Sequence, residues 1–225
     1  MRLPTPASRI GVALVLVAWL GSPGRGAKAE GPEHEFQQLL AKAKDDPEKA
    51  DFRGLRLAFA KTDAYRPYAK DELDTAPVDQ ELKNGERAAA LLALDRTLEG
   101  RWMDPAAHAF AADVCERIGE RKRAKMHGVF LEKIVDTILG AGDGRSFEKA
   151  WPVLSVGEEY LILDAYGFRG RRKQALVHHE GHRYDVHTFT DESSGRELKI
   201  YFNVDVPTRW LGEHTGGPKT EGEQP

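Results

Sequence analysis

The sequence predicts an α+β protein in which a helical layer precedes a small antiparallel sheet with one helix. Up to Leu139 the apolar residues recur every three to four positions, which is typical of amphipathic helices. A glycine-rich segment, residues 140–146, interrupts this pattern, and beyond it the apolar residues alternate as in half-buried strands. We therefore expect a helical region at 30–139 and a sheet region at 140–211, either sharing one core or forming two.

The first 29 residues are typical of a cleavable secretory signal. Arg2 and Arg9 carry positive charge, Ile10–Leu20 is apolar, and residues 27–29 (Ala-Lys-Ala) match a signal peptidase site. An uncleaved membrane anchor is the alternative, but the apolar stretch is about half the roughly 20 residues that span a bilayer. We expect cleavage before Glu30 and an exported protein, periplasmic or secreted, with no membrane span left.

Cleavage would make the protein moderately acidic. The whole chain has 33 Lys and Arg against 36 Asp and Glu, and residues 1–29 hold four of the basic side chains and none of the acidic ones. The remaining 29 basic and 36 acidic side chains give a net charge of −7. This charge argues against a nucleic-acid partner and against binding to anionic lipid.

Several helices are expected before residue 140. Phe36, Leu39, Leu40 and Ala43 have helical spacing, and Asp46-Pro47 is a typical helix start. We expect the helix that begins there to bury Phe52, Leu55 and Phe59. Residues 62–83 show no sustained period and are expected to form a long connection or a short helix between loops.

Two Gly-Glu-Arg turns divide the following helices. They begin at Gly85 and Gly119 and are 34 residues apart, the period of tetratricopeptide-type helical hairpins. Ordinary antiparallel helices joined by short turns are the alternative. We expect a helix after the first turn, and we expect its buried side to consist of Ala88, Leu91, Leu92 and Leu98.

Cys115 is the only cysteine, so no internal disulfide can form. It lies on an apolar helical stripe with Ala111, Val114 and Ile118. We interpret it as a small buried residue, with a reactive thiol as the alternative.

Beyond the glycine-rich segment we expect a short strand at 150–154 and a helix at 156–166, opened by a Ser155–Glu158 capping box. Strands at 174–179, 182–190 and 197–204 follow. Glu180-Gly181 is a two-residue hairpin loop, which pairs His179 with His182 and leaves Tyr184 and Val186 on the largely apolar face. Residues 212–225 contain few apolar side chains and are expected to be a disordered tail.

The chain resembles an uncharacterised bacterial family, domain of unknown function 4919. The matching positions run from about residue 36 to 205 and are Asp51, Phe52, Leu55, Arg56, Tyr65, Pro67, Tyr68, Gly142, Asp143, Gly144, Ser146, Glu158, Glu159, Tyr160, Gly181, Tyr184, Asp185, Val186, Tyr201, Phe202 and Asn203. A departure from the family pattern is the number of histidines around the hairpin. The resemblance implies an exported bacterial protein with helices followed by a sheet, and it implies no activity.

The histidine-rich hairpin is the strongest chemical candidate. His178, Asp185 and His187 lie on one face of the predicted hairpin, and an imidazole–carboxylate–imidazole set could hold a divalent ion. A solvated sheet face, with His178 opposite Arg183, is the alternative. This segment is not the helical His-Glu-x-x-His motif of zinc proteases, because the fifth position is Arg183.

For three further features we prefer a structural explanation to a functional one. Gly142-Asp143-Gly144 could be a phosphate or cation loop or a plain link, and Glu158-Glu159 could be paired carboxylates or acids placed by the helix dipole. Tyr65, Tyr68 and Trp102 could line a groove for a peptide or glycan or pack between helices.

No cofactor is predicted. The interpretation that follows is an exported, non-catalytic binding or interaction protein, for which a protein in the cell envelope is one candidate partner. The alternative is a metal-dependent enzyme or metal carrier. The sequence specifies neither the ligand nor the oligomeric state.

Overall fold

The structure is a computed structural model that describes residues 31–69, 73–168, 171–190 and 195–215. The predicted secretory signal lies outside the described residues. The helices that precede the sheet are α1 (Pro32–Asp45), α2 (Phe52–Phe59), α3 (Ala76–Asn84), α4 (Arg87–Thr97), α5 (Pro105–Arg117) and α6 (Arg121–Leu139). The remaining elements are β1 (Trp151–Pro152), α7 (Val156–Ala165), β2 (Arg171–His179), β3 (His182–Thr190), β4 (Glu197–Asn203) and α8 (Asp205–Thr215).

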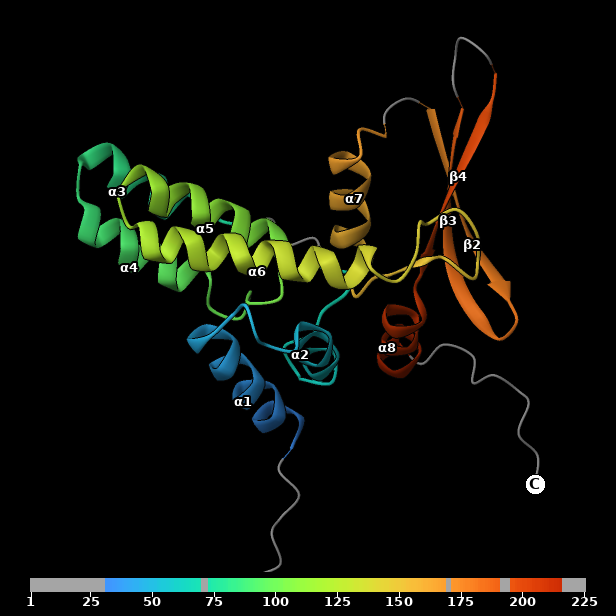
Figure 1. Cartoon of the computed structure of the whole chain (residues 1–225), viewed down its shortest axis with the longest axis horizontal. Helices are drawn as coiled ribbons and strands as arrows, with labels where there is room; N and C mark the ends of the chain where they lie inside the picture. The colour runs from blue at the N-terminus through green and yellow to red at the C-terminus, as the bar shows by residue number, and fades with distance from the viewer. Residues whose placement is uncertain (1–30, 70–72, 169–170, 191–194, 216–225) are drawn as a thin grey trace, which may run out of the picture. The chain divides into compact units, whose positions relative to one another are not determined.

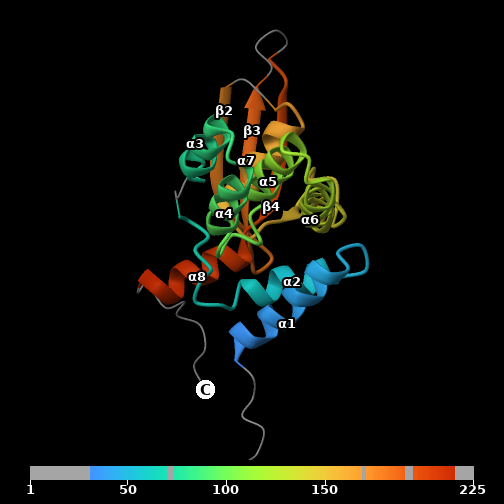
Figure 2. The ribbon, with the colours of Figure 1, turned by 90° about the vertical axis from the view of Figure 1, so that its left-hand side faces the viewer.

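The α+β class and the order of helices before sheet are confirmed. The strands form one sheet in the order β1-β4-β3-β2, in which β3 lies between β2 and β4 and runs antiparallel to both (Figure 2). The sheet is mixed and not purely antiparallel, because β1 runs parallel to β4. Two helices, α7 and α8, accompany the strands in place of the single helix expected.

The hairpin of β2 and β3 has the predicted register. His179 pairs with His182, Tyr184 with Val177 and Val186 with Ala175. Glu180 and Gly181, the two loop residues, both have positive φ, at 48° and 81°. Two consecutive residues with positive φ match the type I′ turn that the twist of antiparallel strands favours, so the loop sets the register.

The two Gly-Glu-Arg turns occupy equivalent places in two helical hairpins, α3–α4 and α5–α6 (Figure 1). Gly85 and Gly119 are left-handed, with φ of 79° and 83°. In each turn the amide of the following glutamate donates to a carbonyl five residues back, from Glu86 to Glu81 and from Glu120 to Cys115. This hydrogen bond is that of a Schellman motif, in which the residue after the helix has a left-handed conformation. Glycine adopts this conformation without strain because it has no Cβ atom.

Two predictions about the helices are wrong. The second helix begins at Phe52, because Asp51 accepts the amide hydrogen of Gly54 whereas the carboxylate of Asp46 bonds Lys49. In α4 the buried side is formed by Ala90 and Leu94, and the prediction is wrong for Ala88, which is exposed, and for Leu92, which is 61% exposed, whereas Leu98 is buried as predicted. Because α4 has apolar residues on its exposed side as well, the helical pattern did not identify its buried side.

The core has apolar clusters in both regions of the chain. The helical clusters include Phe52 and Phe130 in one, and Leu94 and Cys115 in another. Cys115 is fully buried, as predicted. The sheet cluster contains Ile138 of α6 together with residues of α7, β3 and β4, so the end of α6 packs with α7 and the sheet (Figure 1).

The glycine-rich segment is a tightly packed link. A side chain at Gly144 would lie 2.9 Å from the indole ring of Trp151, and one at Gly142 would lie 2.2 Å from the carbonyl oxygen of Lys149. The amide of Tyr201 in β4 donates to the Gly144 carbonyl at 2.9 Å. The two glycines are thus explained by close packing against the Lys149 backbone and the Trp151 ring.

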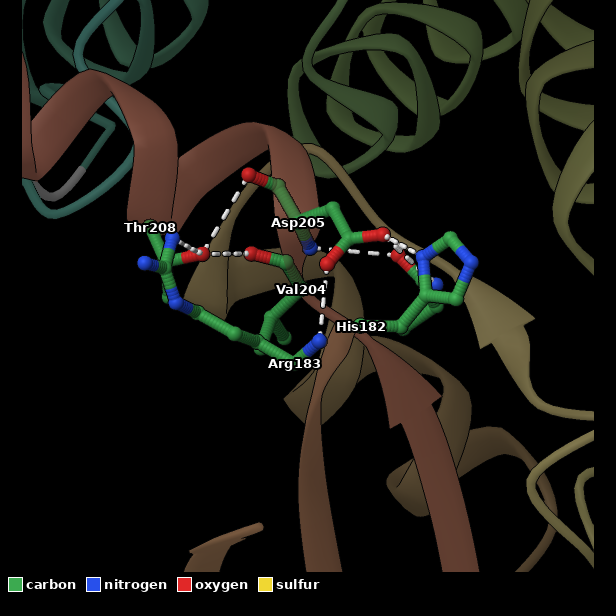
Figure 3. Close-up of polar contacts among 6 residues, drawn as sticks. His182, Arg183, Val204, Asp205 and Thr208 are labelled. Atoms are coloured by element: carbon green, nitrogen blue, oxygen red, sulfur yellow. Dashed lines mark hydrogen bonds and ion pairs between the residues drawn. The ribbon is translucent and has the colours of Figure 1, made fainter. Parts of the chain in front are cut away.

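An unpredicted helix, α8, follows the sheet and is joined to the hairpin through Asp205 (Figure 3). The Asp205 carboxylate lies 2.6 Å from His182 Nδ1 and accepts the backbone amide of Arg183 at 2.7 Å. Burial alone would raise the pKa of the Asp205 carboxyl, but these hydrogen bonds hold that pKa below its usual value. The Thr208 hydroxyl donates at 2.6 Å to the carbonyl of Val204, the residue between β4 and α8.

The last turn of α8 includes residues 212–215, where a disordered tail was expected. The helix α8 makes apolar contact through Trp210, which packs edge-on to Tyr65 and against Tyr68. The rest of the predicted tail lies outside the described residues. In the part of the chain that the structure describes, no helix is both long enough and apolar enough to cross a bilayer.

Candidate functional site

The first turn of α7 carries two buried carboxylates that contact different elements of the fold. Ser155 caps the helix, accepting the amide hydrogen of Glu158. Glu158 is 3% exposed and Glu159 is 1% exposed, so these acids are not the solvated residues that the helix dipole alone would explain. Both precede, by four residues, the core residues Ile162 and Leu163, and this spacing places them on the buried side of α7.

Glu158 faces the helical region, where it forms a buried ion pair. Arg56 Nη2 of α2 donates to Glu158 Oε2 at 2.7 Å, and both side chains are more than nine-tenths buried. The amide of Leu154 donates to the same oxygen at 2.6 Å, and Arg56 Nη1 donates to the Thr137 hydroxyl of α6 at 2.8 Å. Burial raises the pKa of Glu158, and the Arg56 guanidinium opposes that rise. The pair thereby joins α2, α6 and α7.

Glu159 faces the sheet and meets β3. Its Oε2 lies 2.8 Å from Nε2 of His187, which is fully buried. Asp185 lies on the same face of β3, and its Oδ2 accepts a hydrogen bond from Gln174 Nε2 at 2.8 Å. One ligand atom each from Glu159, Asp185 and His187 lie within 4.8 Å of one another. Burial raises the pKa of Glu159, whereas its hydrogen bond to His187 lowers it.

The structure brings together two of the three predicted metal-binding residues. Asp185 and His187 lie in one group, but His178 is exposed on β2 opposite Arg183 and is not part of that group. The face of β3 that carries Asp185 and His187 packs against α7, so His187 is not on a solvated sheet face. Glu159 takes the third place, 28 residues before His187 in the sequence.

A cleft of about 420 Å³ lies beside the Glu158 end of α7. We call it the α7 cleft. Three segments border it, and their lining residues are Phe59, Ala64, Tyr65, Arg66, Pro67, Ala69, Glu99, Gly100, Arg101, Met103, Asp104, Pro105, Ala106, Leu154, Ser155, Gly157, Glu158 and Leu161. The volume falls within the range of roughly 300–1,000 Å³ that is usual for small-molecule sites.

Hydrogen bonds fix the walls of the α7 cleft. The buried hydroxyl of Tyr65 donates to the Leu154 carbonyl at 2.6 Å, and the amide of Val156 donates to the Pro67 carbonyl at 3.3 Å. Burial raises the pKa of Tyr65, so the phenol stays protonated. Tyr65 is thus packed in the core and also lines the cleft, so both alternatives given for it in the sequence, packing and lining a groove, apply.

The rim of the α7 cleft carries charges of both signs. Arg101 Nη1 lies 3.3 Å from Asp104 Oδ2, and Asp104 also caps α5 through the amides of Ala106 and Ala107. Arg66 donates to the Tyr65 carbonyl at 2.9 Å. The apolar lining together with a few placed polar groups is the usual composition of a small-molecule site.

A third polar cluster, unpredicted from the sequence, lies in the helical region. His108 of α5 and His127 of α6 are fully buried, with their Nδ1 atoms 3.0 Å apart. His108 Nε2 lies 3.0 Å from the Trp102 carbonyl, which can only accept a hydrogen bond. His108 Nδ1 is therefore the acceptor and His127 Nδ1 the donor of the shared bond. This assignment leaves His127 Nε2 as a buried acceptor without a partner among the described residues.

Burial lowers the pKa of both imidazoles. It lowers that of His108 to about 4 and that of His127 to about 4, with the neighbouring His108 adding to the effect on His127. The rings stack with aromatic neighbours, His108 on Phe130 and His127 on Trp102. Trp102 therefore packs between helices and does not line the α7 cleft. The pair is a neutral, packed element of the core at pH 7.

Fold and site together define an α+β protein of helical hairpins and a four-stranded mixed sheet, with buried acids and a cleft around one helix. The sequence profile of the family described as Domain of unknown function (DUF4919) matches residues 32–210. The chain belongs to this family, as its sequence resemblance indicated. No curated protein and no solved structure matches the chain.

Proposed function

We propose that the protein is exported and acts by binding a small ligand in the α7 cleft. The observation that carries the proposal is the cleft itself, about 420 Å³ between α7 and two loops whose backbones are held by hydrogen bonds. Pre-formed walls reduce the entropy that binding must overcome. The predicted secretory signal would place the ligand outside the cytoplasm.

The lining favours a ligand with an apolar part and ionised groups of both signs. Leu154 and Leu161 offer apolar surface, while Arg66 and Glu99 bring opposite charges to the rim. Glu158 also lines the cleft, but its charge is compensated by Arg56. A short peptide combines an ammonium, a carboxylate and apolar side chains, and it is therefore the ligand class that we propose.

The test is thermal unfolding of the protein with defined pools of di- and tripeptides. A peptide present at 100 times its Kd and bound only by the folded state adds about 2.7 kcal/mol to the free energy of unfolding. The variant Ala106→Trp places a large side chain on the cleft lining and should remove the rise in the unfolding midpoint.

The matched control is Ala109→Trp, which adds the same side chain at an exposed position of α5 outside the cleft lining. It should keep the full response. A midpoint that no pool raises, or one that rises equally in Ala106→Trp, would contradict the proposal.

A further inference from the structure

We propose that Glu159, Asp185 and His187 bind a divalent transition-metal ion between α7 and β3. The inference is independent of the α7 cleft, because none of these three residues lines it. It replaces His178 with Glu159 in the set that the sequence suggested. The three side chains come from two elements that pack face to face, so the fold assembles the group.

The geometry of the group suits a small ion. Metal–ligand distances near 2.0–2.1 Å require neighbouring ligand atoms to lie about 3.3 Å apart around a tetrahedral zinc ion. The ligand atoms here lie within 4.8 Å of one another, and the closest pair, His187 Nε2 and Glu159 Oε2, is 2.8 Å apart. Small side-chain rotations would therefore bring three ligand atoms into contact with one ion.

The three residues of the group differ in burial. Glu159 and His187 are almost completely buried, whereas Asp185 is half-buried. His187 Nδ1 is buried and has no hydrogen-bond partner among the described residues, so the ring is held by its hydrogen bond to Glu159 and by edge-on contacts with Tyr160 and Phe202. Gln174 donates to one oxygen of Asp185 and leaves the other oxygen for an ion.

The donor set indicates the class of ion. One imidazole with two carboxylates favours zinc, manganese or iron(II) over calcium or magnesium, which prefer oxygen ligands alone. A Zn²⁺ or Mn²⁺ ion bound here would keep open positions for water.

The experiment is calorimetric titration of the metal-free protein with zinc chloride, with manganese chloride as a second probe. Asp185→Asn and Glu159→Gln each keep the shape of the side chain and remove its charge. We expect one zinc ion per chain for the unchanged protein and an affinity lower by at least about 10-fold in each variant, since even outer-shell changes cost 10–100-fold.

His178→Ala is the matched control, because His178 is exposed on the same hairpin and lies outside the group. It should leave the zinc affinity unchanged. Circular dichroism at the titration temperature establishes that each variant is folded. No zinc binding by the unchanged protein, equal binding by all the variants, or a loss confined to His178→Ala would each overturn the proposal.

Discussion

The buried histidine pair should make the stability of the protein depend on pH. His108 and His127 have pKa values of about 4 in the folded protein, against an unfolded value of about 6.5. Between these values the unfolded chain binds more protons than the folded protein. The free energy of unfolding therefore falls as the pH drops below 6.5, and the loss levels off near pH 4, where the folded protein is also protonated.

The size of the effect follows from the two pKa values. Taking one imidazole from pH 7 to pH 5 with these values removes about 2 kcal/mol of stability. Two independent imidazoles would remove about 4 kcal/mol. The tautomer assignment supports so large a shift, because an added proton on His127 Nε2 would find no acceptor among the described residues.

The assay is urea unfolding at pH 7 and pH 5 of the unchanged protein and of the double variant His108→Leu/His127→Leu. Taking the difference between the two proteins cancels other titrating groups, including the buried Glu158 and Glu159. Their raised pKa values add stability as the pH falls. The unchanged protein should lose about 2–4 kcal/mol more than the double variant.

The control is His178→Leu, which removes an exposed histidine and should keep the pH dependence of the unchanged protein. The reasoning is refuted if the double variant and the unchanged protein lose the same stability between pH 7 and pH 5. That result would mean that the imidazoles are solvated or paired with an acid in solution.

Two further predictions concern the packing around α7 and β1. Arg56→Met leaves Glu158 as an unpaired buried carboxylate and should lower the free energy of unfolding by about 3–5 kcal/mol. The double variant Arg56→Met/Glu158→Leu should recover part of this loss, and a double variant no more stable in urea than Arg56→Met would argue against the ion pair. Gly144→Ala should cost more than Gly85→Ala, because both residues have positive φ but only a side chain at Gly144 meets an obstacle, the Trp151 ring at 2.9 Å. The left-handed backbone alone costs about 1–2 kcal/mol, and equal thermal midpoints for the two variants would contradict the packing contact.

Elements determined by local chemistry were predictable from the sequence. The Glu180-Gly181 loop gave the β2–β3 register because two residues with positive φ allow one hairpin geometry. The Ser155 cap gave the start of α7 for a similar reason. The start of α2 was mistaken because Asp46 and Asp51 are both acceptable caps in sequence. Only the structure shows that Lys49 takes the Asp46 carboxylate.

The candidate sites depend on contacts between distant parts of the chain, which local patterns do not encode. Asp185 and His187 were predictable because they are two residues apart on one strand face. Glu159 was not, because its partner lies 28 residues away on another element. The i to i+4 spacing from Glu158 and Glu159 to Ile162 and Leu163 was the available signal, since it puts acids on an apolar helix face. The parallel pairing of β1 with β4 likewise needed the assembled fold.

The most direct measurement of the proposed function is a two-dimensional amide NMR titration with the short peptide that best raises the unfolding midpoint. Binding in the α7 cleft predicts that the shifted amides include those of Gly100, Ala106 and Gly157, which belong to two of its bordering segments. Shifts that gather instead on the β2–β3 hairpin, or no shifts at saturating peptide, would contradict the assignment of the cleft as the binding site.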